Sequence, residues 1–323
     1  MSGLADARNR DDTESVVYGV TAVRAAEAAR PATITRPVAA ALAATVLLWA
    51  SLFVATKAAL PVYAPGHLML LRFGLASLTL ALVAVWRRPR LPSARDLPVL
   101  AASGLLGITL CNLGMTFGTR TVTAGSASML ASLGPVFAAL LATILLHERL
   151  RVWGWAGMVV SFAGVAIIAL GEGGGMRLEP GAGLLALGAL AQGASFVVQK
   201  SAFGRYGPVE LFSYTIWIGS LPMLAFAPGL LETVKSAPLD ATLGVVYLGV
   251  VAGALAQCVW AYALAQIPAS RASSFLYLIP GLAVVLGWGY LGEMPTVLAL
   301  VGGTLTLAGV VLINTLGRER SAE

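Results

Sequence analysis

The chain has 323 residues, of which 58% are hydrophobic and 11% are charged, with a mean hydropathy of +0.84. Soluble domains carry about 25% charged residues, so this composition excludes an ordinary soluble enzyme and indicates an integral membrane protein. A net charge of +6 would suggest a nucleic-acid partner in a soluble protein. In a membrane protein, basic residues instead mark cytoplasmic loops, so we expect a lipid bilayer and a small-molecule substrate as partners, and no nucleic acid.

Residues 1–36 are rich in alanine and in charges of both signs, without the apolar core of a cleaved signal, and predict a disordered cytoplasmic tail. The apolar runs that follow are about twenty residues long and do not alternate with period two, which favours spanning helices over a barrel. Ten spans are predicted, at about residues 37–57, 66–86, 97–117, 123–146, 153–171, 181–201, 208–230, 242–265, 269–291 and 296–314. Residues 315–323 form a second cytoplasmic tail, and the short loops leave no room for a soluble catalytic domain.

The orientation follows from the distribution of lysine and arginine. The side that carries both termini has sixteen of these residues, and the other side has four: Lys57, Arg120, Arg177 and Lys235. Without the N-terminal tail the ratio is still eleven to four. Because basic residues concentrate in cytoplasmic loops, both termini are expected to be cytoplasmic.

The chain contains an internal duplication. Segments 123–149 and 268–293 align at a constant offset of 145 residues, which matches Pro135 with Pro280 and Glu148 with Glu293. Tyr63-Ala-Pro65 matches Tyr206-Gly-Pro208 at an offset of 143, and Gly157 and Gly164 match Gly302 and Gly309 at 145. Each repeat therefore has five spans, 37–171 and 181–314, and an odd number of spans makes the second copy enter the membrane from the opposite side. We predict an all-α integral membrane fold of ten transmembrane helices in two inverted five-helix repeats, as in many secondary transporters.

The paired prolines Pro135 and Pro280 lie near the middle of their spans. A proline there frees a backbone carbonyl one turn earlier and kinks the helix, so the two residues are candidate hinges. A tolerated packing kink is the alternative. Small residues surround both prolines, and among them Ser128 and Ser273 either pack between helices or face a cavity.

Arg72 lies within the second span, where a guanidinium is costly unless it reaches water, a carbonyl or an anion. It could snorkel to the outer headgroups, or it could form a cationic patch with Lys57, which ends the first span on the same side. Such a patch would favour a carboxylate or another anionic substrate over a bare cation.

Other polar or aromatic side chains within spans complete the set of candidate cavity residues, although helix packing explains each of them as well. Asn112 and Gln257 align at the offset of 145 and form a symmetric pair. The full set of substrate-cavity candidates is Trp49, Ser51, Arg72, Asn112, Ser128, Gln257, Ser273 and Tyr277.

No acidic residue falls in the middle of a span, so no carboxylate is available there as a proton relay. Glu148 and Glu293 end their spans on opposite faces and are either gate elements or solvated helix caps. The sequence lacks HExxH, GxSxG and phosphate-loop motifs, so we expect no catalytic residues, no metal and no cofactor. Cys111 and Cys258 lie in apolar runs and are interpreted as isolated buried thiols.

With these residues identified, the chain resembles the EamA family of the drug/metabolite transporter superfamily over residues 37–314. The resemblance rests on Trp49-Ala-Ser51-Leu-Phe53-Val-Ala-Thr-Lys57, Leu71-Arg72-Phe73, Pro135 with Glu148-Arg149-Leu150, and Pro280 with Leu291-Gly292-Glu293. It implies a bacterial inner-membrane carrier that works by alternating access, commonly an exporter of amino acids or related metabolites. One departure is Thr215, which stands in the second repeat where the first has Arg72, so the cavity should be asymmetric in charge.

The resulting hypothesis is a secondary transporter whose hinge and gate candidates are Lys57, Pro135, Glu148, Pro280 and Glu293. A passive facilitator or channel for small metabolites could share the inverted repeat, and a flippase for a lipid-linked substrate is a third alternative. Proton coupling, the direction of transport and the choice between monomer and homodimer stay open at this stage.

Overall fold

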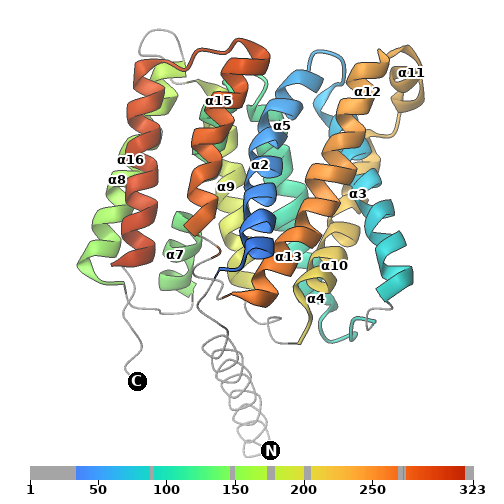
Figure 1. Cartoon of the computed structure of the whole chain (residues 1–323), viewed down its shortest axis with the longest axis horizontal. Coiled ribbons are helices and arrows are strands. Elements are labelled where there is room, and N and C mark those ends of the chain that lie inside the picture. Colours follow the sequence, from blue (N-terminus) through green and yellow to red (C-terminus); the bar gives the residue numbers. More distant parts are fainter. Residues whose placement is uncertain are drawn as a thin grey trace, which may run out of the picture.

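The computed structural model describes residues 34–87, 91–145, 150–172, 179–199, 205–267, 272 and 274–316, and within these ranges the chain is a bundle of helices without a β-strand (Figure 1). The expected tails, 1–36 and 315–323, lie almost entirely outside the described residues. The start of the first described helix and the end of the last lie at the same end of the bundle, the lower end in Figure 1.

The helices follow the predicted spans closely. The first half of the chain contains α2 (Arg36–Ala59), α3 (Pro65–Arg87), α4 (Leu97–Gly104), η1 (Leu105–Leu110), α5 (Cys111–Gly118), α6 (Ala124–Ala131), α7 (Gly134–Leu145) and α8 (Val152–Glu172). The second half contains α9 (Pro180–Gln199), α10 (Pro208–Ser220), η2 (Leu221–Phe226), α11 (Leu230–Ser236), α12 (Leu239–Val246), η3 (Tyr247–Leu255), α13 (Ala256–Gln266), η4 (Leu276–Leu278), α15 (Ile279–Leu291) and α16 (Val297–Thr315).

Nine helical stretches in the described part are long and apolar enough to cross a membrane. The ninth predicted span, 269–291, is represented by a shorter apolar helix, Leu276–Leu291, because residues 268–271 and 273 lie outside the described ranges. The chain is thus a multi-pass membrane protein, since each stretch satisfies its backbone hydrogen bonds internally, as lipid requires.

Both paired prolines coincide with an interruption of their helix. Pro135 is the second residue of α7, which is separated from α6 by two residues, and Pro280 is the second residue of α15, which follows the short 3₁₀ helix η4. Proline has no N–H to offer the carbonyl four residues earlier, so the helix loses a bond and breaks there. That these breaks act as hinges stays a prediction.

A second symmetric feature was not visible in the sequence. The third and eighth predicted spans each contain a π-helical segment, η1 and η3, and both end two residues before the paired amides Asn112 and Gln257. A π segment widens the helix and breaks the register of its hydrogen bonds, and such segments occur often at functional sites.

Helices α8 and α16 pack with their backbones in contact. A Cβ added at Gly157 would lie 2.7 Å from the carbonyl oxygen of Gly309, and one at Gly164 would meet the carbonyl of Gly302. Between these contacts, the hydroxyl of Ser161 donates to the carbonyl of Thr306 at 3.2 Å. Small residues permit this approach, which gives van der Waals packing in lipid where the hydrophobic effect does not drive helices together.

Contacts between the two halves are reciprocal. Ser161 and Thr306 differ by the repeat offset of 145, and the hydroxyls of Ser77 and Ser220, which lie 3.4 Å apart, differ by 143. The hydroxyl of Tyr206 donates to Asp96 of the first half, and that of its equivalent, Tyr63, lies 2.7 Å from Thr242 Oγ1 of the second half. The hydroxyl contacts of Ser161 and Ser77 thus join positions that are equivalent in the sequence repeat, and each tyrosine contacts a residue of the opposite half.

Gly164→Ala is expected to destabilise the protein, because the new Cβ cannot fit against the backbone of Gly302. Overpacking of this kind costs about 1–3 kcal/mol, and the thermal unfolding midpoint of the detergent-solubilised protein should fall. The matched control is Gly183→Ala in α9, where a Cβ would have no heavy atom within 4 Å. Equal midpoints for the two variants would contradict the proposed close packing of α8 and α16.

Candidate functional site

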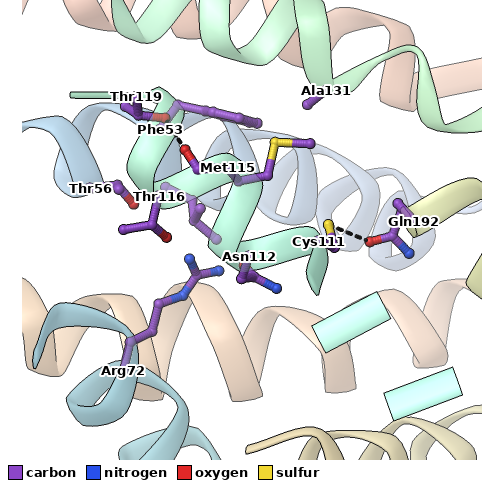
Figure 2. Close-up of a pocket in the computed structure, with 11 residues that line it drawn as sticks. Phe53, Thr56, Arg72, Cys111, Asn112, Met115, Thr116, Thr119, Ala131 and Gln192 are labelled. Atoms are coloured by element: carbon purple, nitrogen blue, oxygen red, sulfur yellow. Dashed lines mark hydrogen bonds between the residues drawn. The ribbon is translucent and has the colours of Figure 1, made fainter. Parts of the chain in front are cut away.

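A cavity of about 190 Å³ lies between helices of both halves (Figure 2). Its lining comes from α2, α3, α5, α6 and α9 with the residue that follows α5, and comprises Leu52, Phe53, Thr56, Arg72, Cys111, Asn112, Met115, Thr116, Thr119, Ala131 and Gln192. Of these residues only Arg72 is charged, so the described lining is electropositive and holds no carboxylate.

The spacing of the lining residues follows from helix geometry. On α2 they are four or fewer residues apart, and from Cys111 to Thr119 they recur at intervals of one and three residues. Residues three and four apart share a face of a helix, so α2 and α5 each present one face to the cavity. Ala131 is the residue four positions before Pro135, so the carbonyl that the proline leaves without a helical partner belongs to a cavity residue.

Arg72 extends from α3 toward Thr116 and Asn112 (Figure 2). Its Cζ lies 4.9 Å from the centroid of the Phe73 ring, which is within the range of a cation–π contact. Within the described part of the chain, no hydrogen bond or ion pair to this guanidinium is present. Its five N–H donors are therefore available to a ligand.

Polar groups around Arg72 can also bind a ligand. The hydroxyl of Thr56 is buried and has no hydrogen-bond partner among the described residues. Asn112 donates from Nδ2 to the carbonyl of Ile108 in η1 at 2.9 Å, which orients the amide and leaves its carbonyl oxygen out of that bond. On the far side, the thiol of Cys111 donates to Gln192 Oε1 at 3.2 Å. A buried polar atom without a partner is costly, so a ligand that gave the Thr56 hydroxyl a hydrogen bond would gain free energy.

A polar network joins three chain segments beside the cavity. Lys57 Nζ donates to the carbonyls of Thr119, Arg120 and Val122 at 2.9, 3.1 and 2.7 Å, and it lies 4.0 Å from Glu293 Oε1. The other carboxylate oxygen of Glu293 accepts from the backbone N–H of Ala124, the first residue of α6, at 2.7 Å. We call Lys57, Glu293 and these backbone groups the lysine–glutamate network.

The lysine–glutamate network depends on the end of α15. Gly292 ends this helix with φ of 65°, and the N–H of Glu293 donates back to the carbonyl of Gly287. A left-handed residue of this kind turns the chain sharply and favours glycine. The Glu293 carboxylate then lies at the N-terminus of α6, where the unpaired N–H groups and the helix dipole stabilise a negative charge.

A second polar cluster joins the loop before α4 to the loop before α10. Asp96 is buried, accepts from Tyr206 Oη at 2.6 Å and pairs with Arg205 at 2.5 Å. Burial, and then the hydrogen bond to Asp96, raise the pKa of the Tyr206 hydroxyl above its usual value. The phenol therefore keeps its proton and continues to donate to Asp96 as the pH rises through the range in which an exposed tyrosine would ionise.

The model of the EamA-like transporter family matches residues 36–170 and 179–315 of the chain. The chain belongs to this family. It is 39% identical over 284 residues to a probable terminal-alkyne amino-acid exporter of Streptantibioticus cattleyicolor, covering 87% of this chain and 95% of the relative. It is 37% identical over 263 residues to the uncharacterized transporter YdfC of Bacillus subtilis, covering 81% and 86%. The crystal structure of another protein, 20% identical in sequence, matches this chain with a TM-score of 0.56. The match covers 90% of this chain and all of the other protein's chain, so the two share the fold.

Two residues of the predicted set line the cavity of this EamA-family transporter, Arg72 and Asn112. Others have partners elsewhere: Ser51 hydrogen-bonds Tyr247, Ser128 donates to the carbonyl of Gly125 on its own helix at 2.6 Å, and Tyr277 accepts from Asn314 at 3.0 Å. Trp49 contacts Trp260, and Gln257 lies half-buried on α13. Ser273 and Glu148 lie outside the described residues.

Several lining residues were missing from the predicted set, notably Thr56, Thr116, Thr119 and Gln192. For one of them the spacing from a recognised residue offered a signal, because Thr116 lies four residues after Asn112. Residues at such helical spacing share a face, so extending each recognised position by one turn would have found Thr116.

Glu293→Ala is expected to lower the thermal unfolding midpoint, because the N–H of Ala124 loses its acceptor and Lys57 loses its counter-charge. Loss of a helix N-cap acceptor costs about 0.5–2 kcal/mol. Glu293→Gln keeps an acceptor without the charge, so its unfolding midpoint should lie between those of the parent and of Glu293→Ala. The control is Glu232→Ala, an exposed acidic residue of α11. A midpoint unchanged in Glu293→Ala would show that the network contributes nothing to the fold.

Proposed function

We propose that this EamA-family transporter exports a small amino acid or a related carboxylate across the bacterial inner membrane by alternating access. The observation that carries the proposal is the guanidinium of Arg72 in a cavity between the helices, without a hydrogen-bond or ion-pair partner among the described residues. A charge held among membrane-spanning helices is unfavourable unless it is paired, and a substrate carboxylate supplies both the opposite charge and the acceptors.

The rest of the cavity supports a small substrate. Its volume of about 190 Å³ is below the range of roughly 300–1,000 Å³ that is typical for drug-sized ligands. Thr56, Asn112 and Gln192 offer acceptors for an amino group, and Leu52, Phe53 and Met115 offer apolar contact for a side chain. The relative that is 39% identical carries the name of a probable amino-acid exporter, which supports the same class of cargo.

Two inverted five-helix repeats, 37–171 and 181–314, are part of this proposal. Support comes from the reciprocal contacts between equivalent residues, from the two matches of the family model at 36–170 and 179–315, and from the common end of α2 and α16. The basic residues favour the cytoplasm for that end. Glu293 would then stabilise one gate, and its equivalent Glu148 would act at the opposite face.

A passive facilitator is the second candidate, and one observation favours it. No acidic side chain lines the described cavity, so a proton that drives transport would have to bind elsewhere. Counterflow in proteoliposomes with and without a proton gradient separates the two. Accumulation against the substrate gradient only when a proton gradient is imposed would identify a coupled carrier.

Arg72→Ala is expected to abolish the preference for carboxylates, because the anchoring charge is lost. In everted membrane vesicles with a panel of radiolabelled amino acids and their carboxamides, the apparent KM for the transported acid should rise about tenfold to hundredfold, while the carboxamide is unaffected. Arg120→Ala removes an exposed cation near Lys57 and is the control. Transport of every tested carboxylate at the parental rate by folded Arg72→Ala protein would contradict the role of Arg72.

The inverted repeat makes a separate topological prediction. Single cysteines introduced at positions 148 and 293, in a background with Cys111 and Cys258 replaced by serine, should react with an impermeant thiol reagent from opposite sides of the membrane. A cysteine at Leu91, which is 90% exposed, marks the side on which α3 ends. Reaction of both test positions from the same side would exclude the inverted repeat.

A further inference from the structure

The first spans of the two halves align without a gap at the offset of 143, which matches Pro37 with Pro180, Phe53 with Phe196 and Lys57 with Lys200. In the same alignment Trp49 is equivalent to Gln192, and at the offset of 145 Trp260 is equivalent to Met115. Gln192 and Met115 both line the cavity. The two tryptophans therefore occupy the positions that would line a second, symmetry-related cavity.

That second position is filled. The indole rings of Trp49 and Trp260 contact each other with centroids 5.5 Å apart and an interplanar angle of 50°. Trp260 is 8% exposed and belongs to an apolar cluster with Val38, Leu42 and Ile267, against which Trp49 packs. Met115 and Gln192 line a polar cavity, whereas the two equivalent positions are occupied by packed indoles.

The position of Trp49 on its helix relates the pair to the cavity. Trp49 lies three residues before Leu52 and four before Phe53, which both line the cavity, so it shares their face of α2 one turn closer to the start of that helix. The lysine–glutamate network lies at the opposite end of α2, which ends at Ala59. The tryptophan pair thus lies on one side of the cavity and the network on the other.

We propose that Trp49 and Trp260 form the gate that closes the substrate cavity toward the end of the bundle where α2 begins. The inference rests on the cavity being the substrate site. An aromatic contact suits this task, because two indole rings exclude water when they meet and leave no uncompensated charge when they separate. The duplicated fold would use equivalent positions in two ways: Met115 and Gln192 as ligand contacts, and Trp260 and Trp49 as a gate.

The thiol of Cys111 lines the cavity and reports access to it without knowledge of the substrate. In a Cys258→Ser background, a charged methanethiosulfonate is added to right-side-out or everted vesicles. Trp49→Ala/Trp260→Ala should react at Cys111 about tenfold faster than the parent from the side on which α2 begins, the change that corresponds to about 1.4 kcal/mol. From the other side the rate should not change.

Trp288→Ala is the matched control, because this tryptophan of α15 is 58% exposed and should leave both rates at the parental values. If the double alanine variant is not inserted, Trp49→Gln/Trp260→Met introduces the residues that occupy the equivalent positions in the cavity. The reciprocal variant, Met115→Trp/Gln192→Trp, should fill the cavity and slow the reaction of Cys111 from the side of the lysine–glutamate network. If a membrane-inserted variant that lacks Trp49 and Trp260 is labelled at Cys111 at the parental rate from both sides, the proposed gate is overturned.

This test separates the gate from the proposed cargo. Faster labelling of Cys111 in a protein that moves no amino acid would support the gate and contradict the proposed substrate. Amino-acid transport by the parent, combined with labelling that the tryptophan variants do not change, would support the substrate and overturn the gate.

Discussion

Close approach of helix backbones at small residues is the constraint on which the rest of this structure depends. Lipid chains are as apolar as leucine, so helices in a membrane gain little from burying apolar side chains and must gain from packing. Glycines touch the backbone of a neighbouring helix in three places. Gly164 of α8 contacts Gly302 of α16, and Gly104 of α4 contacts Gly219 of α10. Gly249 of η3 contacts the backbone of Arg72 in α3. Each of these contacts joins the first half of the chain to the second, and a cavity of defined shape can form only between halves fixed in this way.

Polar groups are distributed in a complementary pattern. Near the helix ends, charges are paired: Lys57 has carbonyls and Glu293 as partners, and Asp96 has Arg205 and Tyr206. Within the cavity, the charge of Arg72 and the hydroxyl of Thr56 lack partners among the described residues. Paired charges hold chain segments together. A ligand that pairs with the unpaired groups would bind with a more favourable free energy. The division separates the groups that hold the fold from the groups suited to bind.

The sequence predicted the parts of the fold and the site that depend on residue type alone. Spans follow from apolar length, helix breaks follow from the missing N–H of Pro135 and Pro280, and Arg72 was found because a guanidinium within a span is rare. Threonines of the cavity were missed because a hydroxyl in a helix usually bonds its own backbone, as Thr119 does with Met115, and so gives no indication of which way it faces. The π segments η1 and η3 depend on packing between helices and have no signature in residue type.

The two tyrosine contacts, Tyr63 with Thr242 and Tyr206 with Asp96, have a consequence for the energy of the proposed transport cycle. In an inverted duplication with identical halves, the inward-open and outward-open states would be related by the twofold rotation that exchanges the halves, and they would be equal in free energy. Here one tyrosine meets a neutral hydroxyl, and the other meets a carboxylate that also pairs with Arg205. Divergence of the halves at such positions would remove this degeneracy and give the empty carrier a preferred resting state, which decides the side on which the empty site waits while the gradients still set the direction of net transport.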